Sequence, residues 1–404
     1  MHMAKVIVHI DLNAFFVRAE EIKDPSLEGK AVAIGRSGRA GIVSTCSYKA
    51  REYGVRSAMP MNQAMKLCPG LIILPGDYRF YSALSYEFKS FIKTYTKIVE
   101  EASIDEVFAD FTEVIKGQKD IEGFFKGLQN DLFNKTGLKC SIGIGPTKFL
   151  AKMGSDYKKP MGITIIRRKD IPTILYPIKI EDMFGVGKKT APRLKSIGIN
   201  TIGDLALRLN NEDEDTLKIL GKFAYELKEW VNGYGDDNVI THFDDPKSIG
   251  NSTTLKEDTS NYETIESTFS MICQEVSYRA KRDNLMGTTI QIMVKDTSYQ
   301  AHNKSLTFDT PTNDYRAIFD YAMKLYDKNY INQTIRALGV TLQNLVSPKD
   351  LAIQMTFFDY ERHEEENMTK LIINEINRKL TSGGKLIRAS EAENKKDDGN
   401  SGRD

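Results

Sequence analysis

The feature that most constrains this fold is a short apolar run near the N-terminus, residues 6–10 (VIVHI), which ends at the carboxylate of Asp11. Most of the run is β-branched, and such a run predicts a strand that is buried inside a sheet. Between residues 78 and 95, apolar residues recur at steps of three and four, which predicts an amphipathic helix that covers the sheet. The N-terminal part of the chain is therefore predicted to be an α/β domain, with Asp11 at the end of a buried strand.

Two further carboxylates are predicted to lie beside Asp11. Residues 97–101 and 107–111 are predicted to form the strands of a hairpin, and the tight bend between them contains Asp105 and Glu106. Alternating helices and strands follow as far as residue 166 and complete a mixed α/β domain. Because the hairpin and the first strand belong to one sheet, we expect the three carboxylates to meet on neighbouring strands.

The remaining segments predict further domains, since 404 residues suffice for about two to four. Residues 23–77 form a small insertion with one predicted strand, over residues 41–44, and short helices around Tyr48 and Asn62. A helical region covers residues 171–231, and Pro192 is expected to kink one of its helices. We divide the chain into residues 1–22 with 78–166, 23–77, 167–235, a linker over 236–247, 248–346 and a polar tail over 347–404.

Composition excludes several classes of protein. Apolar residues make up 41% of the chain, but no apolar run approaches the roughly 20 residues of a membrane span, so we expect a cytoplasmic protein without a membrane partner. The four cysteines have no metal-ligand spacing and are expected to be reduced packing residues. Net charge is only +1, yet residues 130–200 contain 14 basic and 5 acidic residues, which indicates a surface suited to phosphates.

The three carboxylates suggest a metal site. Carboxylate oxygens suit Mg²⁺, and acidic residues on adjacent strands can hold two divalent ions about 4 Å apart for phosphoryl chemistry. Considered alone, three acidic residues in a chain of this length are a weak signal, because helix caps and solvated surface positions are their commoner roles.

Five motifs stand out along the chain: residues 9–16 (HIDLNAFF), 44–56 (STCSYKAREYGVR), 103–106 (SIDE), 143–148 (GIGPTK) and, more loosely, 336–340 (RALGV). In this order and spacing they resemble the motifs of the Y-family DNA polymerases, in particular the DNA polymerase IV type. The resemblance implies a right-hand α/β polymerase, with a palm (1–22 and 78–166), fingers (23–77), a helical thumb with a helix-hairpin-helix (167–235) and an α/β little finger (248–346). It also implies error-prone, template-directed extension of a primer 3′-hydroxyl during translesion synthesis.

The resemblance assigns roles to individual residues of the catalytic core. Two Mg²⁺ ions would be held by catalytic carboxylates and one main-chain carbonyl, and the triphosphate of a dNTP by a second set of residues. Phe16 resembles the steric gate that excludes a 2′-hydroxyl, whereas Ile42 and Ser44 would roof the nascent base pair. Asn13 departs from the acidic residue of many polymerase IV sequences. The metal set is Asp11, Leu12 (carbonyl), Asp105 and Glu106; the triphosphate set is Thr45, Tyr48, Arg51 and Lys159.

Other motifs point to macromolecular partners. Gly185 and Gly187 with Lys188 resemble the hairpin of a helix-hairpin-helix, which binds DNA backbone phosphates, and Arg336 is a candidate template-phosphate contact. A pentapeptide near the C-terminus resembles the motif with which bacterial polymerases dock on the sliding clamp (beta subunit). The expected partners are thus primer-template DNA, dNTP and the clamp, bound by a monomer. The pentapeptide is Gln354, Met355, Thr356, Phe357 and Phe358, with Phe357 in place of the usual Leu.

Two alternatives remain open at this stage. A DNA- and clamp-binding accessory protein could use the same fold without catalysis, although the intact carboxylates argue against it. A nucleotide cyclase could use similar carboxylates on a similar sheet, but the thumb-like and little-finger-like segments would then have no purpose.

Overall fold

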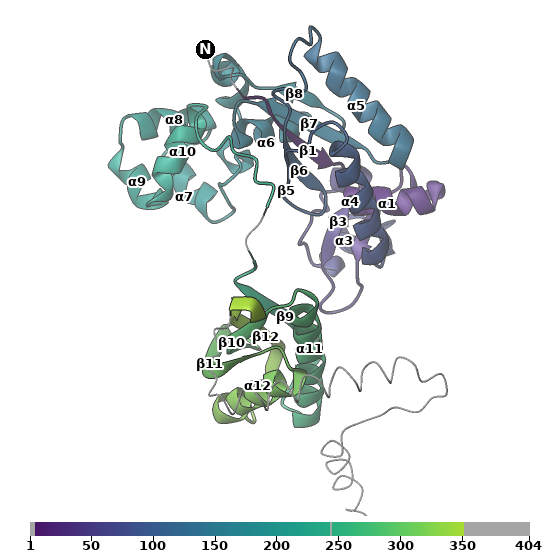
Figure 1. The fold of residues 1–404 in the computed structure, drawn as a ribbon, viewed down its shortest axis with the longest axis vertical. Coiled ribbons are helices and arrows are strands. Elements are labelled where there is room, and N and C mark those ends of the chain that lie inside the picture. The colour runs from purple at the N-terminus through teal and green to yellow at the C-terminus, as the bar shows by residue number, and fades with distance from the viewer. Residues whose placement is uncertain (1–4, 243–244, 351–404) are drawn as a thin grey trace, which may run out of the picture. The chain divides into compact units, whose positions relative to one another are not determined.

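The computed structural model describes residues 5–242 and 245–350. These residues divide into two compact units, which are considered separately (Figure 1). The first unit extends to residue 245 and includes residues 254–257; the second comprises residues 246–253 and the described residues from 258 onward. Within the described residues, no helix is both long and apolar enough to cross a membrane.

A five-stranded sheet forms the centre of the first unit, in the order β5-β6-β1-β7-β8 (Figure 1). The predicted central strand is β1, and it pairs antiparallel with both β6 and β7, while β7 pairs parallel with β8. This arrangement confirms the predicted α/β domain. The strands are β1 (Ile7–Leu12), β5 (Val99–Glu101), β6 (Glu106–Asp110), β7 (Cys140–Gly145) and β8 (Ile163–Ile165).

The two faces of β1 have different surroundings. Val8, Ile10 and Leu12 point into the main hydrophobic core beneath three helices, α1 (Phe15–Lys23), α4 (Tyr78–Ile92) and α5 (Ile121–Thr136). Because side chains alternate along a strand, His9 and Asp11 point to the opposite face. There α6 (Lys148–Tyr157) packs on β7 and β1. The acidic residue thus lies on the face that α6 covers, away from the main core.

Gly143 explains how close α6 lies to the sheet. A Cβ atom at this position would collide with the main-chain oxygen of Ala151 and the main-chain nitrogen of Ser155, both in α6. Only glycine permits such an approach of two backbones. The glycine-containing β7 therefore brings the side chains of α6 within reach of β1.

The insertion contains more strands than predicted. Instead of one strand, it forms a three-stranded sheet in the order β3-β2-β4, where β2 pairs antiparallel with β3 and parallel with β4. Each of the two missed strands is an apolar run of only three or four residues. The elements are a 3-10 turn (Pro25–Leu27), β2 (Val32–Gly35), β3 (Val43–Cys46), α2 (Tyr48–Glu52), α3 (Met61–Leu67) and β4 (Ile72–Leu74).

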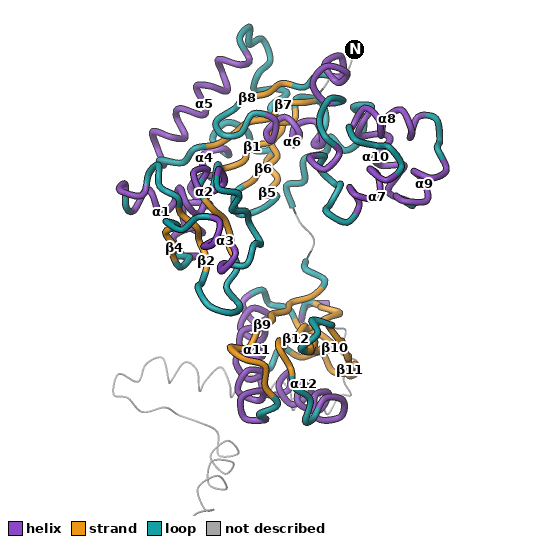
Figure 2. Tube along the Cα trace, turned by 180° about the vertical axis from the view of Figure 1, so that it is seen from behind, coloured by secondary structure: helices purple, strands orange, loops and turns teal. Residues whose placement is uncertain are grey.

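The helical region gathers α7, α8, α9 and α10 into one cluster (Figure 2). Pro192 does not kink α7: it lies in the first turn, where the main-chain N–H of a helix has no intrahelical partner to lose. Trp230 of α10 stacks on Phe149 of α6, with ring centroids 5.1 Å apart. The four helices are α7 (Thr190–Ser196), α8 (Ile202–Asn210), α9 (Glu214–Leu220) and α10 (Phe223–Val231), after single turns at Arg168–Asp170, Ile171–Leu175 and Ile180–Asp182.

The start of the predicted linker lies on the first unit. Lys148 binds the carboxylates of Asp236 and Glu100 at 2.9 and 2.6 Å. Val239 is buried in a small cluster with Ile7. Residues 236–240 are therefore part of the α/β domain surface.

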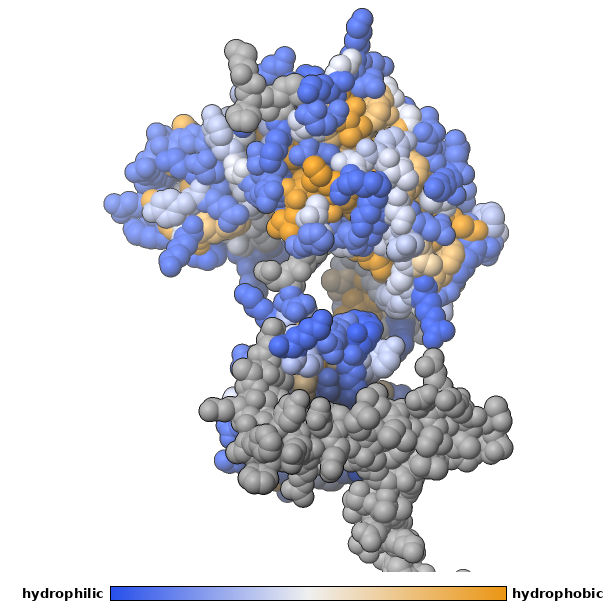
Figure 3. All heavy atoms as spheres, in the orientation of Figure 1, coloured by the Kyte–Doolittle hydropathy of each residue, from blue (hydrophilic) through white to orange (hydrophobic). Residues whose placement is uncertain are grey.

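The second unit has the order β9-α11-β10-β11-α12-β12, so the predicted alternation of strands and helices holds except at the hairpin of β10 and β11. Its sheet has the order β11-β10-β12-β9, and both helices pack on it and on each other. The view in Figure 3 shows a largely hydrophilic surface on the first unit, interrupted by small hydrophobic patches. The elements are β9 (Ser248–Thr259), α11 (Tyr262–Arg282), β10 (Met286–Asp296), β11 (Ala301–Thr312), α12 (Tyr315–Tyr330), β12 (Ile335–Val346) and a final turn (Pro348–Asp350).

Candidate active site

The predicted carboxylates meet on neighbouring strands. Asp11 on β1 lies directly opposite Glu106 on β6 in the antiparallel register. The main-chain N–H of Leu12 donates to the carbonyl of Asp105 at 3.0 Å, which fixes the hairpin bend against the end of β1. Asp11 is 7% exposed and the other two carboxylates are partly buried, so all three lie at the edge of the core.

Two lysines form ion pairs with Asp11 and Glu106 of this cluster. Lys152 of α6 lies 2.8 Å from a Glu106 oxygen and 3.2 Å from an Asp11 oxygen. Lys159 lies 2.7 Å from the same Asp11 oxygen and 2.7 Å from Asp156. Burial alone would lower the pKa of each lysine, but the nearby carboxylates of Asp11 and Asp156 outweigh it and raise the pKa of both. Both lysines are thus held in the charged form.

His9 orients the Glu106 carboxylate through a hydrogen bond. Its Nε2 lies 2.9 Å from Glu106 Oε2, and its Nδ1 lies 2.7 Å from the Ser155 hydroxyl. This hydrogen bond, together with the ammonium group of Lys152, lowers the pKa of Glu106 to about 2 although burial opposes the change, so the carboxylate accepts and Nε2 donates. Burial lowers the pKa of His9, which favours the neutral ring. The sequence-based prediction missed this pair.

Asp105 has a different environment from the other two carboxylates. Its Oδ1 accepts a hydrogen bond of 2.7 Å from the Ser103 hydroxyl. Burial, and to a smaller extent the charges of Asp11 and Glu106, raise the pKa of Asp105. A positive charge placed between these three groups would relieve their mutual repulsion.

The donor set fits a divalent cation. His9, Asp11 and Glu106 each offer one ligand atom, and these three atoms lie within 4.8 Å of one another. Asp105 lies in the adjoining bend. Carboxylate oxygens are the donors that hard cations prefer. Nε2 of His9 already donates to Glu106, so the histidine orients this carboxylate.

The predicted triphosphate residues lie on β3 (Thr45), on α2 (Tyr48 and Arg51) and in the loop after α6 (Lys159). The guanidinium of Arg51 lies over the ring of Tyr48, 4.7 Å from its centroid, and its Nε donates to the carbonyl of Cys46 at 3.3 Å. Burial raises the pKa of Tyr48, so its hydroxyl stays a hydrogen-bond donor. Thr45 is half-buried on β3.

The predicted gate residue has a fixed ring. Phe16 stacks on Tyr81 with centroids 4.4 Å apart and an interplanar angle of 13°, and its edge meets Tyr78. Phe15, by contrast, is a buried core residue. Ile42 is 54% exposed and Ser44 is also exposed, so both predicted roof residues are open to solvent.

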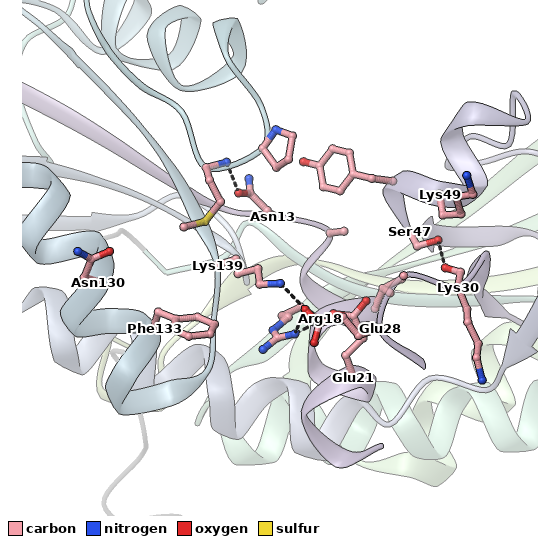
Figure 4. A pocket seen from close by; sticks show the side chains of 16 residues that line it. Asn13, Arg18, Glu21, Glu28, Lys30, Ser47, Lys49, Asn130, Phe133 and Lys139 are labelled. Carbon is pink, nitrogen blue, oxygen red and sulfur yellow. Dashed lines mark hydrogen bonds and ion pairs between the residues drawn. The ribbon is translucent and has the colours of Figure 1, made fainter. Parts of the chain in front are cut away.

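A cavity of about 520 Å³ lies behind this region, lined by residues of α1, α5 and the insertion. Figure 4 shows Arg18, Glu21, Glu28 and Lys139 converging in it. Lys139 pairs with Glu28 at 2.7 Å and Arg18 with Glu21 at 3.0 Å. Both basic side chains are therefore paired with carboxylates of the same cavity.

The predicted DNA-binding residues lie in both units. Gly185, Gly187 and Lys188 are exposed in the turn before α7, where Gly185 adopts a left-handed φ of 90°. In the second unit, Arg336 forms two hydrogen bonds to Asp258, at 3.0 and 2.7 Å. Its guanidinium also lies 4.0 Å from the centroid of the Tyr299 ring.

The clamp-binding pentapeptide lies outside the described residues. The four cysteines are all buried and unbridged, in agreement with the prediction of packing residues. They are Cys46, Cys68, Cys140 and Cys273.

Family models match most of the chain. The impB/mucB/samB family model matches residues 10–156, and the model of the C-terminal domain of that family matches residues 246–356. A model described as the IMS family HHH motif matches residues 168–199, around the predicted hairpin. Together these models cover the carboxylates, the start of the helical cluster as far as α7, and the second unit.

Relatives and a solved structure agree with these matches. DNA polymerase IV of Bacillus velezensis is 38% identical over 391 residues, which covers 95% of this chain and 92% of the relative. DNA polymerase IV 1 of Bacillus subtilis is also 38% identical, over 392 residues, with the same coverage of both chains. A solved Y-family DNA polymerase chimera has a TM-score of 0.73 at 25% identity, covering 85% of this chain and 99% of the chimera.

Proposed function

The chain belongs to the impB/mucB/samB family, the DNA polymerase IV group of the Y-family DNA polymerases, and on that premise we propose that Asp11, Asp105 and Glu106 carry out nucleotidyl transfer with two Mg²⁺ ions. The protein is a template-directed, error-prone DNA polymerase of translesion synthesis, which extends a primer 3′-hydroxyl and releases pyrophosphate. It binds primer-template DNA and dNTP and uses divalent metal ions. The assignment of individual residues below is the proposal.

The observation that carries the proposal is the register that sets Asp11 against Glu106, with Asp105 in the adjoining bend. We propose that these carboxylates and the carbonyl of Leu12 hold the ions. Bound Mg²⁺ supplies Lewis acidity, which lowers the pKa of the primer hydroxyl and offsets charge on the triphosphate. His9 then serves to keep one Glu106 oxygen in place.

We propose that the triphosphate binds between α2 and the loop after α6. Tyr48 and Arg51 lie one turn apart on α2 and present a hydroxyl and a guanidinium, which suit phosphate oxygens. Thr45 and Lys159 complete the set. Lys159 is now shared between Asp11 and Asp156, and a triphosphate would compete with these carboxylates for its ammonium group.

Phe16, Ile42 and Ser44 are proposed to select the substrate. The stack on Tyr81 holds the Phe16 ring in one orientation, which supports a role as a wall against a 2′-hydroxyl. The small, exposed Ser44 and the exposed Ile42 would leave space above the nascent base pair, in keeping with tolerance of damaged templates.

Further partners are proposed from the sequence and the exposed turn before α7. Gly185, Gly187 and Lys188 would bind backbone phosphates of the DNA. Arg336 would do so only if a phosphate displaced Asp258. We further propose a cytoplasmic monomer that docks on the sliding clamp through residues 354–358; substituting Gln354 and Phe358 with alanine should abolish retention on immobilised clamp.

Primer extension tests the catalytic proposal. Wild type should extend a primer on an undamaged template with Mg²⁺ and dNTPs, and the Asp105→Ala/Glu106→Ala variant should not, while retaining DNA affinity. Glu113→Ala, which removes an exposed carboxylate paired with Lys116, is the control and should extend normally. If wild type binds primer-template without extending it, the protein is a DNA-binding accessory factor instead.

A further inference from the structure

The loop that carries Lys159 is held by two buried amide side chains. The amide oxygen of Asn13 accepts the main-chain N–H of Met161 at 2.8 Å. The amide nitrogen of Gln129 donates to the main-chain carbonyl of Met161 at 3.0 Å. Both polar main-chain groups of one residue are thus bound by side chains from two different elements, the end of β1 and the middle of α5.

Both amide side chains also form hydrogen bonds with other groups. Asn13 is 4% exposed, and its amide nitrogen donates to the Ser141 hydroxyl at 2.9 Å. Gln129 is fully buried, donates also to the carbonyl of Cys140 at 2.8 Å, and accepts from Lys126 at 2.8 Å. Because these hydrogen bonds are formed in a buried setting, the geometry of both amides is well defined. Figure 4 shows Asn13 at the edge of the cavity with its hydrogen bond drawn.

Met161 needs such support. Its φ of 62° lies in the left-handed region, which a residue with a Cβ adopts at a cost in free energy. A residue in this region persists when its surroundings fix it, and such residues gather at functional sites. The two amide contacts to Met161 therefore determine the path of the loop.

The same contacts connect two proposed functional groups. Asn13 lies two residues after Asp11, and Met161 lies two residues after Lys159, whose ammonium is 2.7 Å from the Asp11 carboxylate. We propose that Asn13 and Gln129 are positioning residues that hold the loop so that Lys159 meets the triphosphate of the incoming dNTP at the carboxylate cluster. This inference rests on the role proposed for Lys159 above.

The expected effect is on nucleotide binding. A misplaced Lys159 would contact the triphosphate poorly, whereas the carboxylates, which are held by the sheet, would remain in place. Asn13→Leu removes the acceptor for Met161 at similar side-chain volume and should raise the KM for dNTP about 10-fold, the equivalent of one lost charge-assisted contact. kcat and DNA affinity should change little. Asn13→Asp keeps an acceptor and should restore a KM near that of wild type.

Steady-state kinetics in a double-mutant cycle with Lys159→Ala test the proposal. If Asn13 acts through Lys159, then Asn13→Leu should have almost no further effect on the KM for dNTP in the Lys159→Ala background. Thr136→Val is the structural control: it removes a buried hydroxyl of α5 that bonds Leu132 and Leu138, and it should lower the melting temperature without raising this KM. Gln129→Met provides a second variant if Asn13→Leu folds poorly.

The possible outcomes distinguish the proposed triphosphate role of Lys159 from the proposed positioning role of Asn13 and Gln129. If Lys159→Ala raises the KM for dNTP and Asn13→Leu and Gln129→Met do not, the positioning role is overturned and the role of Lys159 stands. The positioning role is also overturned if the increases in the KM for dNTP caused by Asn13→Leu and by Lys159→Ala multiply fully in the double variant. If Lys159→Ala leaves the KM unchanged, the triphosphate role of Lys159 is itself wrong, and the inference built on it falls too.

Discussion

Lys152 offers a sharp test of the metal site. Its ammonium lies 2.8 Å from Glu106 and 3.2 Å from Asp11, and the residue is only 9% exposed. Lys152→Met keeps the aliphatic packing but removes the charge. Removal of one partner from a buried ion pair costs about 3–5 kcal/mol. Each carboxylate retains another partner, Lys159 or His9, so we expect about 3 kcal/mol, the low end of that range.

This loss of stability should appear as a lower melting temperature when no metal is present. For a domain of this size, 1 kcal/mol corresponds to roughly 2–4 °C, so the first unit of Lys152→Met should melt about 6–12 °C below wild type in EDTA. Added Mg²⁺ should recover much of the difference, because a cation bound by Asp11 and Glu106 supplies the missing positive charge. Differential scanning calorimetry with and without Mg²⁺ measures both effects.

Lys148→Met is the matched control for this experiment. Lys148 lies one turn earlier on α6 and pairs with Glu100 and Asp236, away from the predicted metal ligands. Lys148→Met should also lower the melting temperature. Added Mg²⁺ should raise the melting temperature of this variant no more than it raises the melting temperature of wild type. The reasoning is refuted if Lys152→Met melts with wild type in EDTA, or if Mg²⁺ rescues both variants equally.

Three further substitutions test other parts of the structure. Phe16→Ala should reduce discrimination against ribonucleotides by about 10- to 200-fold, measured as the ratio of kcat/KM for dNTP and rNTP; an unchanged ratio would show that the ring is not the gate. Gly143→Ala should abolish activity and unfold the first unit, since its Cβ would collide with α6, whereas Gly127→Ala, in open space on α5, should be tolerated in the same melting assay. Arg336→Ala should destabilise the second unit by about 1–3 kcal/mol through the loss of its pairing with Asp258. It should leave the salt dependence of DNA binding unchanged. If the slope of log affinity against log salt concentration instead fell by about one, Arg336 would be identified as a phosphate contact.

The sequence predicted the main sheet because its signals are local. The run at residues 6–10 is continuously apolar and mostly β-branched, and the tight bend around Asp105 separates two short strands. Once a segment is a strand, its side chains alternate between the two faces, which determines which of them lie together. Asp11 and Glu106 therefore lie opposite each other as expected. The strands Val32–Gly35 and Ile72–Leu74 escaped prediction because runs of three or four apolar residues do not distinguish a strand from a buried turn.

The residues that surround the carboxylates could not be predicted in the same way. Lys152 and Ser155 reach the site because Gly143 allows α6 to lie close to the sheet, and that approach depends on tertiary packing. His9 did give a signal: it lies two residues before Asp11 and must share its face of the strand. A buried histidine is more often a satisfied core residue, so its contact with Glu106 becomes clear only from the structure.

The close approach of α6 also constrains how this polymerase can adapt to heat. One side of the helix supplies core residues such as Phe149 and Leu150, and Lys152 and Ser155 on the same helix hold the site. Hydrogen exchange in α6 should then require opening of the whole first unit, so activity and structure are lost together on warming. Heat-adapted homologues would have to gain their stability on other helices, such as the outer face of α5, where a substitution does not disturb the reacting groups.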